Sequence, residues 1–310
     1  MKSLELIVPC YNEGEVLPLF FSEVSKVLNL LSDYDSRIIF VDDGSKDETL
    51  NIIKRFADSD SRVKYISFSR NFGKEAAMLA GLRFSSADLV GIIDADLQHS
   101  PNLIPEMLAS LEGDYDVAAA KRADRKGESK FRSSLSDSFY KVANRMTEIK
   151  IDPNAQDFRI MKRKVVDAIL SMTEYNRFTK GIFSFVGFRT KWFEHENRQR
   201  AAGETKWNIR KLFSYAFDGI LGYSSVLLKL PLVIGLLMLC GGLIYAVVSL
   251  IAAIVSPAPL SVVHPLLSVI FIIDGLILIS IGIAGEYLAR VYGEVRNRPV
   301  FIVDETNITK

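Results

Sequence analysis

Two aspartates one residue apart, Asp94 and Asp96, directly follow an apolar run in the stretch VGIIDADLQHSP at residues 90–101. Successive side chains of an extended chain alternate between its two faces, so both carboxylates are expected on the same face. Two carboxylates aimed at one small volume repel each other and raise each other's pKa, so the pair needs a cation or water around it. A hard divalent cation that keeps several waters and also binds phosphate oxygens suits such a pair. The spacing alone does not specify that site, because Asp-X-Asp is common in loops.

The apolar run before Asp94 is one of a series of short runs that predict β-strands. These runs are LELIVP, RIIFVDDGS, VKYISFS, DLVGIIDAD and YDVAAA. The segments KDETLNIIKRFA, GKEAAMLAGLRFS and PNLIPEMLASL between them have apolar residues at helical spacing. Strands that alternate with helices predict an α/β fold with a mostly parallel sheet covered on both faces. In such sheets, ligands bind at the carboxyl ends of the strands.

Polar residues follow every one of these predicted strands. A single strand-end acid can do no more than cap the next helix. Consecutive strand ends that all carry polar groups favour a shared ligand site instead. The residues concerned are Asn12, Glu13, Asp42, Asp43, Arg70, Asp94, Asp96, Lys121 and Arg122.

The composition limits the class of protein. A length of 310 residues allows one large domain with an appendage or two modest domains. The formal net charge of +1 gives no basic excess of the kind that marks nucleic-acid binding. The only cysteines, Cys10 and Cys240, make neither a disulfide framework nor a metal pattern, which indicates a reducing compartment. The apolar stretch at residues 4–8 is too short for a signal peptide and predicts a strand.

Residues 230–284 contain a single charged residue, Asp274. Two apolar segments within them, residues 230–255 and 265–284, are long enough to cross the hydrocarbon core of a bilayer and predict a transmembrane hairpin. The flanks of the hairpin carry Lys and Arg whereas its connecting loop carries neither, so the positive-inside rule places both flanks in the cytoplasm. The alternative is a pair of buried core helices in a soluble domain.

Residues 211–229, just before the first span, mix aromatic and spaced apolar residues after a basic start. This pattern predicts an amphipathic helix in the membrane interface, with an ordinary linker helix as the alternative. Asp274 lies inside the second span, where an acid is a functional hypothesis by default. A protonated acid that is hydrogen-bonded within the hairpin or at a subunit contact is the other interpretation.

Six motifs follow one another along the chain: IVPCYNEGE, VDDGSKDET, RNFGKEAAMLAGL, DADLQ, DFRIMKR and GETKW. Together they resemble the inverting, metal-dependent glycosyltransferases of family 2, which have a GT-A fold. More narrowly, they are similar to the polyprenyl-phosphate glycosyltransferases, which include dolichol-phosphate mannose synthases and bacterial bactoprenol glucosyltransferases. The paired spans and the tail GEYLARVYGEVRNRPVFIV resemble the bactoprenol branch most, and the resemblance covers essentially the whole chain. The Gln-X-X-Arg-Trp signature of the family's processive synthases is absent, which favours transfer of one sugar per encounter.

The resemblance implies where the donor binds. Asp43 would accept a hydrogen bond from the base, Lys74 would lie near the donor diphosphate or the base, and Asp94 would face the ribose and the sugar. The rest of the nucleotide-sugar pocket would come from Pro9, Tyr11, Asn12, Glu13 and Asp42. Separately from the resemblance, we expect the basic residues Arg200 and Lys206 to close over the diphosphate.

The resemblance also implies the catalytic and metal residues. Asp157, in DFRIMKR, matches the family's catalytic-site acid, and we expect it to act together with Asp94 and Asp96. Asp96, with Gln98, would hold Mg²⁺ or Mn²⁺. His99 departs from the family pattern, which commonly has an acid after the glutamine. We interpret His99 as a solvated loop residue, with a spare metal ligand as the alternative.

A polyprenyl phosphate acceptor is a monoester with a second pKa of about 6, so it arrives as an anionic nucleophile. Asp157 would therefore orient the phosphate or the sugar hydroxyls, or accept a proton from the monoanion. The acceptor needs positive charge at the membrane-facing mouth of the site, for which Arg122 and Arg132 are the candidates. A basic surface beside a membrane also attracts anionic lipid without any catalytic role.

We thus predict an enzyme of the cell's inner (plasma) membrane, multi-pass, with a cytoplasmic GT-A catalytic domain. It would transfer a hexose, most simply glucose from UDP-glucose, to polyprenyl (undecaprenyl) phosphate with inversion. The alternatives are the same reaction with GDP-mannose or a UDP-aminosugar, and an inactive membrane-anchored subunit that binds nucleotide. Association through the spans would give a homo-oligomer. The predicted parts are the catalytic domain at 1–210, the interfacial helix at 211–229, the spans at 230–284 and the cytoplasmic tail at 285–310.

Overall fold

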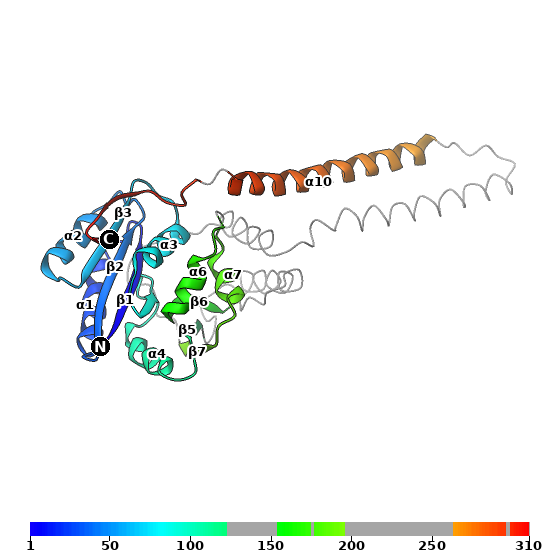
Figure 1. Ribbon diagram of the computed structural model, residues 1–310. Helices are drawn as coiled ribbons and strands as arrows, with labels where there is room; N and C mark the ends of the chain where they lie inside the picture. The colour runs from blue at the N-terminus through cyan, green and yellow to red at the C-terminus, as the bar shows by residue number, and fades with distance from the viewer. Residues whose placement is uncertain (123–153, 175–176, 196–262, 296–297, 310) are drawn as a thin grey trace.

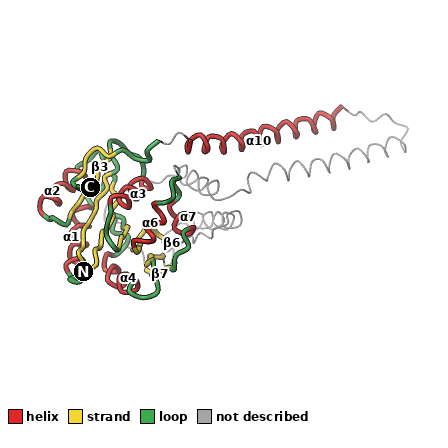
Figure 2. Tube along the Cα trace, in the orientation of Figure 1, coloured by secondary structure: helices red, strands yellow, loops and turns green. Residues whose placement is uncertain are grey.

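The computed structural model describes residues 1–122, 154–174, 177–195, 263–295 and 298–309. The strands, yellow in Figure 2, lie between the helices. They form one 8-stranded sheet in the order β7-β5-β6-β4-β1-β2-β3-β8. β1 pairs in parallel with β2 and β4, β2 with β3, and β5 with β7. β6 is antiparallel to β4 and β5, and β8 is antiparallel to β3. The strands are β1 (Lys2–Cys10), β2 (Tyr34–Asp42), β3 (Val63–Phe68), β4 (Leu89–Ile92), β5 (Val117–Arg122), β6 (Ala155–Lys162), β7 (Thr190–His195) and β8 (Val303–Thr306).

Helices cover both faces of this sheet, and successive strand residues alternate between the two cores. In β1, Leu6 and Val8 pack into one core and Ile7 into the other. Helices α1, α2 and α4 pack on the first face, and α3, α6 and α7 on the second. The helices are α1 (Leu17–Asn29), α2 (Thr49–Ser59), α3 (Lys74–Phe84), the 3₁₀ turn η1 (Pro101–Leu103), α4 (Ile104–Leu111), α6 (Arg163–Leu170) and α7 (Thr179–Phe185).

The predicted α/β alternation is confirmed for the first 122 residues. Each of the predicted apolar runs overlaps a strand, β1 to β5, and the predicted helical segments overlap α2, α3 and α4. The sheet is mostly parallel, as expected, because β6 and β8 alone run against the other strands described. The sequence analysis did not anticipate β6, β7 or β8.

A long helix, α10 (Val263–Val295), projects away from the sheet (Figure 1). It contains the second predicted span, residues 265–284. The first predicted span, at 230–255, and the predicted interfacial helix, at 211–229, lie outside the described residues. Among the helices that the structure describes, none combines the length and the apolarity that a membrane crossing requires.

After α10 the chain returns to the sheet and adds β8 beside β3 (Figure 1). Lys54 on α2 forms an ion pair with Glu305, with Nζ 2.6 Å from Oε1. The side-chain amide of Asn307 accepts a hydrogen bond from the backbone N–H of Tyr65 and donates one to the carbonyl oxygen of Val63. The last part of the predicted tail is therefore a strand of the sheet.

Candidate active site

A cavity of about 630 Å³ opens at the carboxyl ends of β1 to β4. It lies where the strand order reverses, since β1 is flanked by β2 on one side and by β4 on the other. This topological switch point is where open α/β sheets bind ligands. The cavity is lined by Pro9, Cys10, Tyr11, Asn12, Glu13, Asp43, Asn71, Gly73, Lys74, Ala77, Asp94, Ala95 and Asp96.

Lys74, at the first turn of α3, bridges two acids from different strands. Its Nζ lies 2.7 Å from Asp94 Oδ1 and 2.6 Å from Asp157 Oδ2. Asp94 follows β4, whereas Asp157 lies near the start of β6. Because β6 is antiparallel to β4, with Ile92 opposite Arg159, continuing the pairing by two residues sets Asp94 opposite Asp157. The antiparallel strand thus brings the two carboxylates to one ammonium group.

The electrostatics of this cluster favour the charged forms of Lys74 and Asp157. Burial would lower the pKa of Lys74, but the carboxylates of Asp157 and Asp94 outweigh it and hold that pKa above its ordinary value. Burial would raise the pKa of Asp157, but Lys74, together with Lys180 and Arg159, holds it well below its usual range. Asp157 is consequently a carboxylate with little tendency to accept a proton.

Asp43 organises the loop that follows β3. Its carboxylate accepts hydrogen bonds from the backbone N–H groups of Phe72, at 2.6 Å, and Gly73, at 2.9 and 3.1 Å. The side-chain amide of Asn71 donates a further bond at 2.9 Å. Asp43 is only 3% exposed, and burial raises its pKa to about 6 despite these bonds.

Gly44 allows this loop to approach β2. It has a φ of +65°, and a Cβ there would lie 2.4 Å from the backbone carbonyl carbon of Arg70. A residue with a side chain would therefore displace the loop that holds Asp43.

The loop after β1 is fixed to the loop after β2. The backbone N–H of Asn12, a residue with a φ of +52°, donates to Ser45 Oγ at 2.9 Å, and Asn12 Oδ1 accepts the N–H of Lys46 at 2.8 Å. The N–H of Glu13 donates to Thr49 Oγ1 at 2.8 Å. These bonds hold Asn12 and Glu13 on the cavity wall. Sequence reasoning did not identify the anchoring residues, whose hydroxyls gave no signal beyond ordinary capping.

Asp94 and Asp96 both line the cavity, as expected. The reason is not the alternation of an extended strand, because residues 95–96 form a turn and Ala95 lines the cavity too. Gln98 donates its backbone N–H to Asp96 Oδ1 at 3.1 Å, and its side chain is not among those that line the cavity. The interpretation of His99 as a solvated loop residue is wrong. His99 is only 4% exposed, and its ring centroid lies 5.6 Å from that of Phe158 on β6.

The other predicted site residues lie elsewhere. Asp42 is buried behind the loop, where its carboxylate accepts a hydrogen bond from Ser67 Oγ at 3.0 Å. Arg122 ends β5 at the same edge of the sheet as the cavity but is not one of its lining residues. Arg132, Arg200 and Lys206 are outside the described residues.

Sequence reasoning also missed Arg159, which is buried beside Asp157. Its guanidinium carbon lies 3.4 Å from the centroid of the Phe183 ring, and its Nη2 donates to the carbonyl oxygen of Gln156 at 2.7 Å. The motif DFRIMKR contained the signal, because an arginine between the apolar residues Phe158 and Ile160 needs a partner if it is buried.

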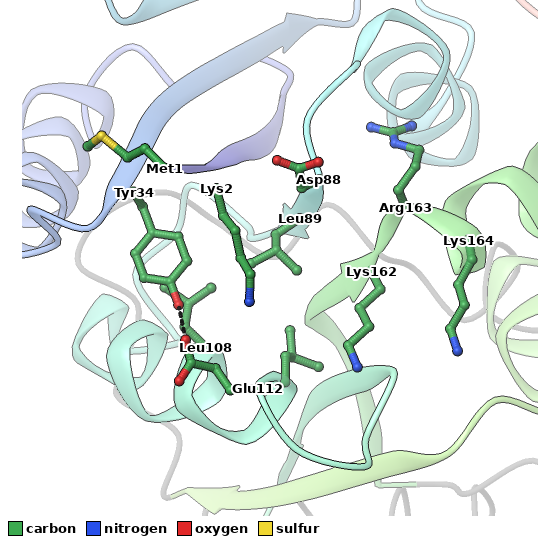
Figure 3. A pocket seen from close by; sticks show the side chains of 11 residues that line it. Met1, Lys2, Tyr34, Asp88, Leu89, Leu108, Glu112, Lys162, Arg163 and Lys164 are labelled. Atoms are coloured by element: carbon green, nitrogen blue, oxygen red, sulfur yellow. Dashed lines mark hydrogen bonds between the residues drawn. The ribbon is translucent and has the colours of Figure 1, made fainter.

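A second cavity, of about 450 Å³, lies at the opposite edge of the sheet and is rich in basic residues (Figure 3). Several of its cations already have partners within the protein. Lys162 and Lys164 pair with Asp116, at 3.6 and 2.7 Å, and Arg163 Nε donates to the carbonyl oxygen of Ala87 at 2.8 Å. This cavity lies at the amino ends of β1 and β4, where sheets of this kind do not bind ligands. The first cavity is therefore the candidate active site.

The fold is an α/β fold of the GT-A type. Its sheet is mostly parallel, an acid-lined cavity lies at the switch point, and the antiparallel strand β6 lies next to β4. The chain belongs to the glycosyl transferase family 2, whose model matches residues 5–170. It is a glycosyltransferase, and the resemblance in its motifs is confirmed.

Similar proteins match over nearly the whole chain. The SfII prophage-derived bactoprenol glucosyl transferase of Shigella flexneri is 38% identical over 304 residues, which cover 98% of each chain. A prophage bactoprenol glucosyl transferase homolog of Escherichia coli is 38% identical over 300 residues, or 97% of this chain and 98% of the other. An uncharacterized glycosyltransferase of Synechocystis, sll0501, is 40% identical over 302 residues, covering 97% of this chain and 95% of the other.

Proposed function

We propose that the protein transfers one hexose, glucose from UDP-glucose, to a polyprenyl phosphate with inversion at the anomeric carbon. The observation that carries this proposal is the bridge that Lys74 makes between Asp94 and Asp157. Lys74 and Asp94 line the switch-point cavity, and Asp157 is not among its lining residues. Family membership supplies the class of reaction. The relatives named bactoprenol glucosyl transferase support glucose and a polyprenyl acceptor.

The charge of the cavity supports a divalent cation as cofactor. Among the described lining residues, Glu13, Asp43, Asp94 and Asp96 are acids and Lys74 alone is basic, so the wall as it stands would repel a nucleoside diphosphate. Within the described part of the chain, no three His, Cys, Asp or Glu residues form a metal cluster. Mg²⁺ and Mn²⁺ fit such a wall, because one or two carboxylates plus substrate phosphates hold them.

When bound, the cation would neutralise the charge that develops on the departing diphosphate. Asp96 would hold it, with Gln98 beside it. Asp94 would face the ribose and the sugar, and Lys74 would keep Asp94 in a fixed position. Asp43, Tyr11 and Pro9 would form the base pocket, with Asn12 and Glu13 on the wall beside them.

The acceptor phosphate needs no strong base. A phosphate monoester has a second pKa of about 6, so at neutral pH an anionic oxygen is available to attack the anomeric carbon. The new bond forms from that oxygen to the anomeric carbon, and the bond from this carbon to the donor diphosphate breaks. Asp157, whose pKa lies well below its usual range, would orient the acceptor phosphate or the sugar hydroxyls instead of accepting a proton.

The acceptor is a lipid, so we place the reaction at the cytoplasmic face of the plasma membrane. The apolar segments at 230–255 and 265–284 would attach the enzyme there, and the segment at 211–229 would lie in the interface. Arg122 and Arg132 would receive the lipid phosphate, and Arg200 and Lys206 would close over the diphosphate. Copies of the chain would associate through the spans.

Transfer of radiolabelled sugar from UDP-glucose into chloroform-extractable lipid tests this proposal. The assay uses the purified full chain, undecaprenyl phosphate and Mg²⁺, with EDTA and Asp96→Ala as controls. Label in the lipid phase that both controls abolish is the expected result. If label comes only from GDP-mannose or a UDP-aminosugar, the proposed reaction stands and the proposed donor is wrong.

No label from any donor, with protein that still binds nucleotide, would contradict the proposal and favour an inactive anchored subunit. Sedimentation of the full chain with membranes, and its resistance to extraction by high salt or carbonate, tests the membrane attachment separately. Release by carbonate would contradict integral attachment without affecting the reaction.

A further inference from the structure

We propose that the C-terminal segment, residues 298–309, positions the donor pocket, and that Phe301 is the positioning residue. This inference rests on the proposed function, because it concerns the pocket to which we assign the nucleotide. The segment after α10 supports the loop at residues 69–73, whose backbone holds Asp43.

The C-terminal segment pairs with the second half of β3, and the Asn307 side chain reaches Val63 and Tyr65 in its first half. Ile66 is opposite Thr306 and Ser67 is opposite Glu305, and Thr306 Oγ1 donates to the carbonyl oxygen of Tyr65 at 2.6 Å. Without this segment, β3 would have an unpaired edge.

The pairing extends past β3 into the loop that reaches the cavity. The backbone N–H of Ser69 donates to the carbonyl oxygen of Ile302 at 3.2 Å. Ser69 is two residues before Asn71, whose side chain binds Asp43. The C-terminal segment therefore contacts this loop directly, in addition to the strand that precedes it.

Three aromatic rings continue the contact to the pocket. Phe301 stacks on Phe68, with ring centroids 5.1 Å apart and planes inclined by 14°. Phe68 packs edge-on against Phe72, with centroids 5.7 Å apart and planes at 90°. The guanidinium group of Arg70 lies over the Phe72 ring, with its carbon 4.0 Å from the ring centroid. The ring of Phe301 thus supports the ring of Phe72 through Phe68.

The backbone of Phe72 carries this support to Asp43. Its N–H makes the shortest of the bonds to the Asp43 carboxylate, 2.6 Å, and the N–H of Gly73 donates to it at 2.9 Å. Asp43 and Gly73 both line the cavity. If Phe72 moves, Asp43 loses backbone donors and the pocket loses its shape. Rigid support of this kind is what a binding constellation requires.

The test measures hydrogen exchange of the Phe72 and Gly73 amides, and the Kd for UDP, in the purified full chain. The variants are Phe301→Leu, which removes the ring, Phe301→Tyr, which keeps it, and Glu305→Gln. Glu305→Gln is the matched control, because it removes the ion pair with Lys54 from the same C-terminal segment without touching the aromatic rings.

We expect Phe301→Leu to raise the exchange rate of both amides and the Kd for UDP by about three- to tenfold, the size of one lost aromatic contact. Phe301→Tyr and Glu305→Gln should behave as the wild type. The inference is wrong if Phe301→Leu leaves the exchange rates of the Phe72 and Gly73 amides unchanged. It is also wrong if the exchange rates of the β1 and β2 amides rise equally. A wild type that binds no UDP, with the exchange pattern as expected, would overturn the proposed donor and leave the positioning role standing.

Discussion

The ammonium group of Lys74 lies 2.6 Å from the carboxylate of Asp157, although 83 residues separate them along the chain. The same ammonium lies 2.7 Å from Asp94. The two acids that follow β4, Asp94 and Asp96, need positive charge nearby to offset their mutual repulsion. For Asp94, the protein supplies that charge itself. Asp96 remains the carboxylate for which we propose the divalent cation.

Replacing Lys74 by methionine should leave Asp94 and Asp157 without their shared cation. We expect the unfolding free energy to fall by about 1–2 kcal/mol, less than for a fully buried pair, because 36% of the Lys74 side chain is exposed to screening solvent. Urea unfolding of wild type and variant measures this change. Lys54→Met breaks the exposed pair with Glu305 and should cost about 0.5 kcal/mol or less. Equal losses in the two variants would show that the Lys74 bridge is an ordinary surface pair.

Asp157→Asn keeps the shape of the side chain and removes its charge. If Asp157 orients the acceptor, kcat for lipid glycosylation should fall about 10²-fold while the KM for the donor stays within about twofold, because misplacing a reactant affects the chemical step. Initial rates at varied UDP-glucose and fixed undecaprenyl phosphate measure both constants. Asp88→Asn changes an acid at the opposite edge of the sheet and serves as the control. A rise in the donor KM with kcat unchanged would reassign Asp157 to donor binding.

Asp43 should make the folded protein more stable in mild acid than at neutral pH. Its pKa is about 6 in the folded state against 3.8 when unperturbed, so between these values the native protein holds a proton that the unfolded chain has lost. The contribution of Asp43 to the unfolding free energy is therefore fully present below about pH 4 and is lost as the pH rises through about 6. The total change is about 2–3 kcal/mol.

The difference in unfolding free energy between wild type and Asp43→Asn isolates this contribution, because other groups titrate in both proteins. Urea unfolding at pH 4, 5, 6 and 7 should give a difference that moves against the wild type by about 2–3 kcal/mol as the pH rises. A flat difference would mean that folding does not raise the pKa of Asp43.

Gly44→Ala should weaken nucleotide binding without touching the ligand. A Cβ at a φ of +65° is strained, and it would meet the Arg70 backbone, so the loop that holds Asp43 must shift. We expect a stability loss of about 1–3 kcal/mol and a higher Kd for UDP. Gly113→Ala is the control, since its Cβ would have only an ordinary contact at 3.8 Å. Calorimetric titration with UDP distinguishes the two variants, and an unchanged Kd in Gly44→Ala would contradict the role of the loop.

Local patterns in the sequence determined most of the fold's first half. Apolar runs bounded by polar residues gave β1 to β5, and helical spacing gave α2, α3 and α4, because strand and helix periods are properties of neighbouring residues. The same patterns put Glu13, Asp43, Asp94 and Asp96 at strand ends, and the structure places all four on one cavity wall. The prediction that His99 is exposed was wrong, because burial depends on what packs over a loop, and here Phe158 from a later strand packs against the His99 ring.

Only the tertiary structure decided which distant groups meet. Nothing in the residues around Asp157 specifies that β6 runs antiparallel between β4 and β5, yet this orientation places Asp157 beside Lys74 and Asp94. The pairing of residues 303–306 with β3 could not be predicted from the sequence either, because a four-residue strand is too short for its pattern to indicate which strand it pairs with. Pairing between strands is chosen by register and burial over the whole sheet, so the sequence determined the chemical groups and the assembled sheet determined their contacts.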